Sequence, residues 1–179
     1  MQQYTPYILI GVVATILIVV TVVVARAMWR GQVRRYIIIL TGHREAIVSA
    51  LKTVESVVAG LAQGDAEKVM AFAEEDSDER QPLAEIAERM RIAQAELSDI
   101  ALPKKLWRLA DILCDAADSL AQQAGGIGDQ AGEAVLDALL ALDLVTVRDR
   151  LSEAATEAER VSVLYRMTDP SVYGGGLYI

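Results

Sequence analysis

Residues Tyr7 to Ala25 have the sequence YILIGVVATILIVVTVVVA, a run of 19 residues without a charged side chain. At about 1.5 Å per helical residue the run spans about 28 Å, close to the roughly 30 Å hydrocarbon core of a membrane. Val and Ile favour strands in water, but a lone strand in lipid leaves its backbone amides and carbonyls unpaired, whereas a helix pairs them internally. The run therefore predicts a transmembrane helix.

Aromatic residues set the expected limits of this span. Tyr7 and Trp29 bracket the run, as amphipathic rings do at the two headgroup levels of a membrane. We therefore expect a transmembrane helix over residues 7–29, preceded by a short extracytoplasmic N-terminus, residues 1–6. The alternative is a cleaved signal peptide. The leading MQQYTP carries no basic residue, and the run exceeds the usual apolar region of about 7–15 residues, so we expect a retained anchor.

Orientation follows from the arginines on the C-terminal flank of the run. Arg26, Arg30, Arg34 and Arg35 lie there, within or beside a basic juxtamembrane segment, residues 30–36. Excess arginine stays in the cytoplasm, so we expect the N-terminus outside and the rest of the chain inside. Three of the four are spaced by four residues and share a helix face. The simpler interpretation is a topology signal; the alternative is recognition of anionic headgroups, which usually needs a larger cluster.

The remaining chain is strongly acidic. Beyond Arg35 it has 13 of the 17 basic residues and all 25 acidic ones, a formal charge of −12. Such a domain is repelled by nucleic acid and by anionic membrane surfaces, so we expect no nucleic-acid binding and a preference for basic partners. Cys114 is the only cysteine, which excludes an intramolecular disulfide and suits a reducing cytoplasm. The Ala- and Val-rich composition is typical of a high-GC bacterium, so the predicted location is a bacterial inner membrane.

Apolar residues at spacings of three and four predict an all-α fold over residues 37–168, an acidic cytoplasmic helical bundle. Four main amphipathic helices with short connections favour an antiparallel, up-and-down arrangement. Pro82 suits the first turn of a helix, Gly125 and Gly126 are expected to end another, and the last helix has a candidate break near Asp143. The expected helices cover residues 37–61, 66–74, 82–100, 104–123 and 129–167, the second being short and Gly64 and Asp65 providing its stop and N-cap.

No reaction centre is visible in the sequence. His43 is the only histidine and lacks the Glu-x-x-His spacing of a di-iron bundle, so we expect a surface or interhelix residue. Cys114 lies between apolar neighbours and is interpreted as a small buried hydrophobe. The run from Glu74 to Glu79 is interpreted as a solvated loop, with a basic partner as the alternative. We therefore predict no catalytic residue, no metal and no cofactor.

The C-terminal tail, residues 169–179, contains three consecutive glycines followed by an apolar end. The glycines predict a flexible segment. Leu177, Tyr178 and Ile179 are candidates for docking on a partner, because a free apolar C-terminus can add to a partner sheet. The alternative is that they fold back on the bundle or stay loose.

The leading hypothesis is a single-pass membrane protein that acts as a non-enzymatic adaptor or scaffold and recruits a protein partner to the cytoplasmic face. A subunit of a signalling or secretion/envelope complex, coupling through its membrane helix, is the alternative. It requires the anchor helix to continue through Gly31 into the bundle. An enzyme is the least favoured hypothesis.

Overall fold

The computed structural model describes residues 5–74 and 77–165, with side chains described from Ile16 onward. Among these residues every regular element is a helix, which confirms the predicted all-α class. The chain forms two units, Met1–Ile37 and Ile38–Ile179. The six α-helices are α1 (Thr5–Ala62), α2 (Ala66–Ala73), α3 (Gln81–Asp99), α4 (Trp107–Gly128), α5 (Glu133–Leu140) and α6 (Leu144–Tyr165), with 3₁₀ turns η1 (Asp78–Arg80) and η2 (Lys104–Leu106).

Helix α1 contains the predicted transmembrane span and continues through Gly31 without interruption. In the second unit its apolar seam is buried, as the spacing of three and four predicts. Tertiary packing therefore stabilises this part of the helix, since amphipathic burial contributes more than intrinsic propensity. The buried seam residues of this part are Leu40, Ile47, Leu51, Val54 and Leu61.

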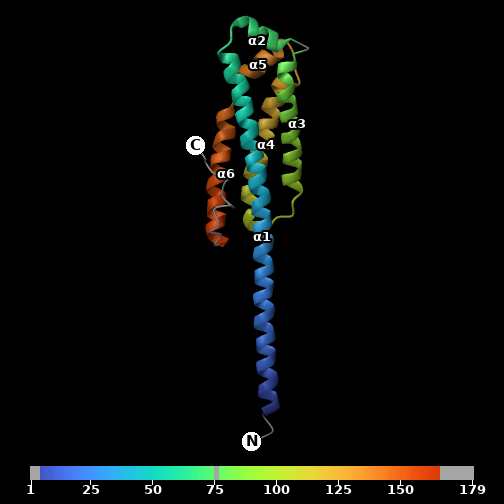
Figure 1. The fold of residues 1–179 in the computed structure, drawn as a ribbon, viewed down its shortest axis with the longest axis vertical. Helices are drawn as coiled ribbons and strands as arrows, with labels where there is room; N and C mark the ends of the chain where they lie inside the picture. The colour runs from blue at the N-terminus through green and yellow to red at the C-terminus, as the bar shows by residue number, and fades with distance from the viewer. Residues whose placement is uncertain (1–4, 75–76, 166–179) are drawn as a thin grey trace. The chain divides into compact units, whose positions relative to one another are not determined.

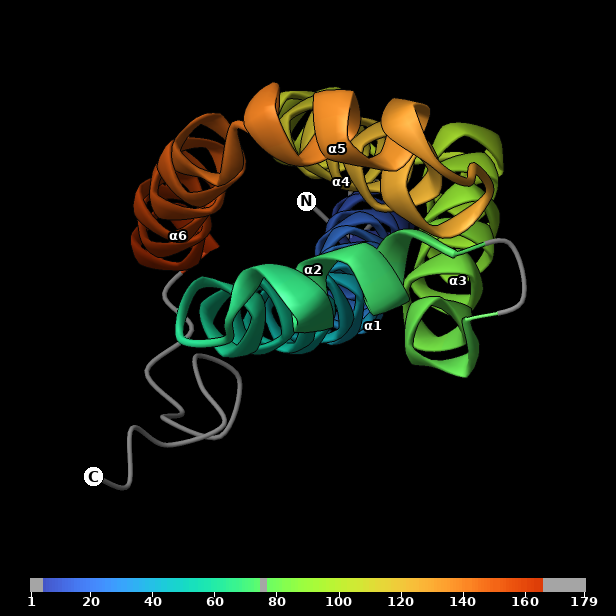
Figure 2. The ribbon, with the colours of Figure 1, turned by 90° about the horizontal axis from the view of Figure 1, so that it is seen from above.

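The second unit is an antiparallel bundle of four main helices in the described chain. Figures 1 and 2 show α3, α4 and α6 running alongside the part of α1 that belongs to this unit, with successive long helices reversing direction. The short helices α2 and α5 lie together at the end where α1 finishes (Figure 1). Helix α4 packs against α3, α5 and α6. Its apolar face includes Leu113 and Leu120, both fully buried, which places α4 at the centre of the core.

Helix starts follow the predicted local signals. Asp65 caps α2, because its side chain accepts a hydrogen bond from the Lys68 backbone amide at 3.0 Å. Pro82 lies in the first turn of α3, where its missing amide proton costs no intrahelical bond.

The break near Asp143 is confirmed, and the model shows its physical cause. Asp143 Oδ1 accepts from the Thr146 amide at 3.1 Å and so caps α6. The Gln123 side chain on α4 meets both backbone groups of the same residue: it accepts from the Asp143 amide at 3.0 Å and donates to its carbonyl at 2.9 Å. The amide and the carbonyl of Asp143 are thereby hydrogen-bonded outside a helix, so the break costs little free energy.

The predicted end of the fourth segment is wrong. Gly125 and Gly126 lie inside α4, which continues to Gly128. Glycine often ends a helix, but here tertiary packing keeps Gly125 and Gly126 helical. A methyl group at Gly128 would lie 2.4 Å from the backbone nitrogen of Ala84, so α3 and α4 approach closely only because this residue has no side chain.

We expect Gly128→Ala to destabilise the bundle by about 1–3 kcal/mol, because the new methyl group would force α3 and α4 apart. Urea unfolding of the full-length protein in detergent, followed by circular dichroism, measures the loss. Gly126→Ala is the matched control: its methyl group would meet Ala138 at an ordinary 3.7 Å, so we expect unchanged or higher stability. Equal stability of the two variants would contradict the close approach.

Candidate membrane anchor and interaction surfaces

The N-terminal part of α1 presents apolar side chains on every side. Each residue from Ile16 to Gln32 is exposed, and the exposed fractions of Ile16, Val20 and Val24 are 58%, 52% and 50%. An apolar surface of this extent is unfavourable in water and marks an interaction site. Among the described residues α1 is the one helix long and apolar enough to cross a membrane, a criterion of length and composition that a signal sequence also meets.

The predicted flanking residues all lie on α1. Arg26, Arg30, Arg34 and Arg35 are exposed, and Trp29 is 46% exposed. Tyr7 belongs to the helix, but its side chain lies outside the described residues. The arginines therefore follow the apolar surface directly on one continuous helix.

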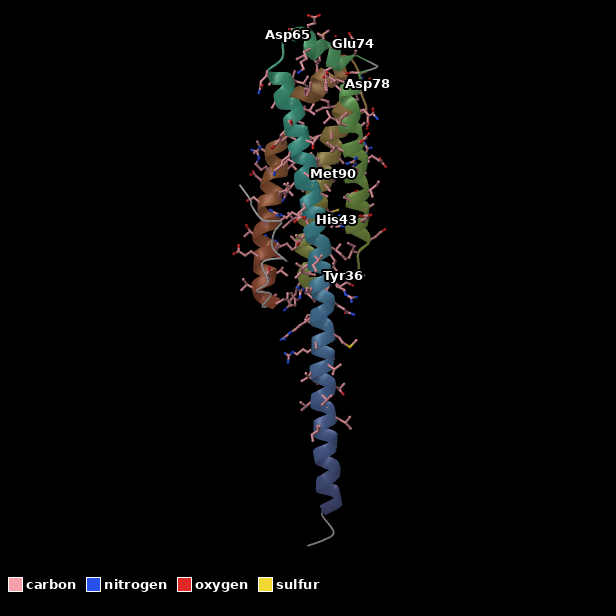
Figure 3. The ribbon with its side chains drawn as sticks, viewed as in Figure 1. Tyr36, His43, Asp65, Glu74, Asp78 and Met90 are labelled. Carbon is pink, nitrogen blue, oxygen red and sulfur yellow. The ribbon has the colours of Figure 1, made fainter. Side chains whose placement is uncertain are left out.

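A surface groove of about 440 Å³ runs between α1 and α3 in the second unit. Its floor is apolar and buried, including Ile86 and Met90, and its α1 wall consists of small residues. The His43 ring at one end lies 3.7 Å from a Glu96 carboxylate oxygen. Figure 3 shows His43 and Met90 in the same middle region of the bundle. The small residues of the α1 wall are Ala46, Ser49, Ala50 and Thr53.

Charged groups at this groove pair with one another. Arg89 lies 3.2 Å from Glu85 on the same helix, and His43 faces Glu96 across the two helices. His43 is thus an interhelix polar residue, as the sequence suggested. These two contacts lie at the rim of the groove, one within α3 and one between α1 and α3.

The single thiol lies between α3 and α4. Cys114 Sγ is 3.4 Å from the Ser98 hydroxyl oxygen and 3.8 Å from the Gln94 carbonyl oxygen, and the residue is half-buried. The predicted small buried hydrophobe is therefore in a more polar and accessible position than expected. In residues 5–74 and 77–165 no group of three or more His, Cys, Asp or Glu side chains is placed to hold a metal ion.

Acidic residues gather where α1 ends and α2 begins. Asp65, Glu74 and Asp78 lie at this end of the bundle (Figure 3). Arg80 is almost completely buried, and its Nη2 donates a hydrogen bond to the Glu74 carbonyl oxygen. The first residue of the run that the sequence predicts to be a solvated loop is thus held by a buried guanidinium.

Glu157 on α6 was not singled out by sequence reasoning. It is 5% exposed, and Arg160 donates to it from Nε at 2.8 Å and also from Nη2. These hydrogen bonds from Arg160 lower the pKa of Glu157 below its ordinary value; burial opposes the shift, and the charges of Arg160 and Arg108 add to it. The sequence held one indication that Glu157 is buried. Glu157 follows the buried residue Ala154 by three positions, which places both on the same face of α6.

Ion pairs link the helices of the bundle around its surface. Arg108 on α4 lies 3.2 Å from Glu153 on α6, and Arg148 on α6 pairs with Glu55 on α1. Exposed pairs of this kind contribute roughly 0–1 kcal/mol each. They therefore contribute little to the stability of the fold, although they connect α6 with α4 and with α1.

The candidate docking residues Leu177, Tyr178 and Ile179 lie outside the described residues, as does the rest of the tail from residue 166.

No protein-family model, no curated protein and no solved structure matches this chain. Its function is therefore inferred from its own residues.

We expect Glu157→Gln to cost on the order of 1–2 kcal/mol of unfolding free energy at neutral pH, because a buried charge-assisted pair is lost. The folded-state pKa is lowered, so the carboxylate stabilises the fold above its unfolded value of about 4.5 and this contribution is lost as the pH falls through the folded value. The difference from wild type should shrink accordingly in urea unfolding series at neutral and acidic pH.

Glu153→Gln on the same helix is the control for this prediction. Its side chain is 40% exposed, so we expect a loss of roughly 0–1 kcal/mol. A Glu157→Gln deficit that is independent of pH would contradict the assigned role of the carboxylate.

Proposed function

We propose that this protein is a single-pass membrane protein whose acidic bundle acts as a non-enzymatic adaptor and holds a protein partner at the cytoplasmic face of a bacterial inner membrane. The observation that carries the proposal is the apolar surface exposed on all sides of α1 from Ile16 to Val24. In lipid this surface is favourable, and the helix satisfies its own backbone groups.

The arginines beyond the apolar surface support the orientation. Arg26, Arg30, Arg34 and Arg35 follow it within ten residues, and the sequence before it contains no Lys or Arg. The positive-inside rule then favours a cytoplasmic bundle. The location in a bacterial inner membrane rests on composition and on this charge asymmetry.

The features of the bundle support a binding function more than an enzymatic one. Its core is filled mainly by aliphatic side chains, and Arg89 and Glu85 beside the α1–α3 groove pair with each other. The net charge of −12 beyond Arg35 suits a partner with a basic surface. We propose the apolar C-terminal residues Leu177, Tyr178 and Ile179 as a second contact with that partner.

Site-specific photo-crosslinking in native membranes tests this function. We expect the protein to stay in the membrane fraction after alkaline carbonate washing. A photoreactive residue at Leu177 should give a discrete adduct with one partner, whereas the same residue at exposed Asp149 on α6 should not. Release by carbonate would contradict the anchor, and adducts of equal yield from both positions would contradict a defined partner surface.

A second candidate function is transmembrane coupling within a signalling or envelope complex. The observation that favours it is the continuity of α1 through Gly31, where the helix has open space around the missing side chain. A helix that continues from the membrane segment into the first bundle helix is the element that coupling requires.

Gly31→Pro separates the two functions, because proline breaks the helix at a cost of about 3 kcal/mol or more. Under coupling, streptavidin bound to a biotin tag at Gln2 on the outside should change the crosslink yield at Leu177 in wild type and lose this effect in Gly31→Pro. Gly31→Ala is the control and should behave as wild type, since a methyl group there meets nothing within 4 Å. No response to streptavidin in wild type would contradict coupling and leave the adaptor function standing.

A further inference from the structure

The groove between α1 and α3 opens to the outside of the second unit. Its lining on α3 runs from Pro82 to Glu96, a length of about 21 Å at 1.5 Å per helical residue. Figure 2 shows α4 on one side of the pair formed by α1 and α3, and α6 beside α1. Ser49 and Thr53 on the α1 wall of the groove are exposed, so neither α4 nor α6 covers this wall.

The shape of the groove suits a helix. Ile86 and Met90 form a buried floor, whereas Ile92 on the α3 side is 50% exposed, so the apolar surface continues from the floor to solvent. The small residues of the α1 wall allow another backbone to approach closely, because the distance between packed helices depends on the side chains at the contact. A length of about 21 Å corresponds to about four helical turns. One apolar face of a helix therefore fits along this groove.

Charge selects among the helices that the shape admits. The residues that line the groove include two carboxylates, Glu85 and Glu96, and one guanidinium, that of Arg89, which pairs with Glu85. The Glu96 side chain faces the His43 ring at 3.7 Å and is 60% exposed, so a lysine or arginine can reach it from solvent. The charge of −12 beyond Arg35 attracts a basic segment over a longer range, whereas a second copy carries the same negative excess and is repelled.

We propose that the α1–α3 groove binds an amphipathic helix of the protein partner, with its apolar face on Ile86, Met90 and Ile92 and a lysine or arginine at Glu96. This inference rests on the proposed adaptor function and deepens it, because it names the docking surface and the kind of segment bound there. Burial of the apolar face supplies the main attraction, as in other complexes in which a helix lies in a groove. The basic residue fixes the orientation of the helix.

Photo-crosslinking of a model helix to the full-length protein in phosphatidylcholine nanodiscs tests the proposal. The probe is a synthetic peptide of about 18 residues with leucines at spacings of three and four and lysines elsewhere. A photoreactive residue at Ile92 should give an adduct with this peptide, and the same residue at exposed Asp149 on α6 should give little. A matched peptide with glutamate in place of every lysine should not react at Ile92. The comparison of two positions on one protein removes the effect of peptide bound to lipid.

Two variants locate the binding within the groove. Ser49→Trp fills the groove from its α1 wall and should abolish the adduct at Ile92. Its control is Ser152→Trp on α6, since both serines are exposed and the carbonyl of each accepts a threonine hydroxyl four residues later at 3.1 Å. Glu96→Lys leaves the groove open and should lower the adduct yield by up to about fivefold, the effect of one exposed ion pair. Circular dichroism checks that each variant is folded.

Several outcomes would overturn the proposal. Equal yields at Ile92 and Asp149, equal yields of the basic and acidic peptides, or an adduct that survives Ser49→Trp would each exclude selective binding in the groove. Without peptide, a crosslink between two copies would assign the groove to a dimer. A crosslink from Ile92 to residues 166–179 of the same chain would assign it to the tail.

Failure of the proposed function gives a different result. The carbonate wash and the crosslink at Leu177 test the anchor and the partner without the peptide. If both succeed and the basic peptide does not react at Ile92, only the assignment of the groove is overturned. If the peptide reacts at Ile92 but carbonate releases the protein, the anchor is contradicted and the groove remains a binding surface.

Discussion

A helix whose apolar side chains face outward in every direction is the constraint on which the rest of this molecule depends. Ile16 to Val24 expose half or more of their apolar surface, and the described chain offers nothing that covers them. Such a surface is unfavourable in water, and in an apolar solvent a helix has the advantage that it pairs its own backbone. The arginines begin where the apolar run ends, which is the arrangement expected of a helix whose apolar part lies in lipid.

Close contact between helices in the bundle depends on small residues. Where the chain leaves one helix and starts the next, polar side chains hydrogen-bond the backbone. Gly128 permits the approach of α4 to Ala84 on α3, and Ala116, Ala117 and Ala124 are buried along the same helix. Gln123 hydrogen-bonds both backbone groups of Asp143, so these groups keep protein partners where α5 has ended and α6 begins. Packing without large side chains explains how a domain with few aromatic residues fills its core.

The helices and their buried faces could be predicted because apolar spacing reports burial directly. Leu83, Ile86 and Met90 show this on α3, and the Asp65 cap was found because capping is a local signal. Gly125 and Gly126 were misjudged because their effect depends on neighbours distant in sequence: a methyl group at Gly125 would lie 2.9 Å from Arg91 Nη2. The hydrogen bonds of Glu157 and Arg80 were missed: the spacing of Glu157 from buried Ala154 was the one indication for Glu157, and nothing local indicated that Arg80 is buried.

Positive and negative charges lie in different parts of this sequence. Every positive charge before residue 44 lies within ten residues, and all the acidic residues follow. Within the bundle several arginines pair with carboxylates, as Arg91 does with Asp129 and Arg108 with Glu153. The hydrogen bonds that Arg91 donates to Asp129 and Glu88 raise its pKa. Several positive charges of the bundle thus pair with carboxylates of the same bundle, and acidic residues still outnumber basic ones beyond Arg35 by 12. A surface of this sign suits a basic protein and is repelled by nucleic acid and by anionic lipid, which supports the proposed binding of a protein partner.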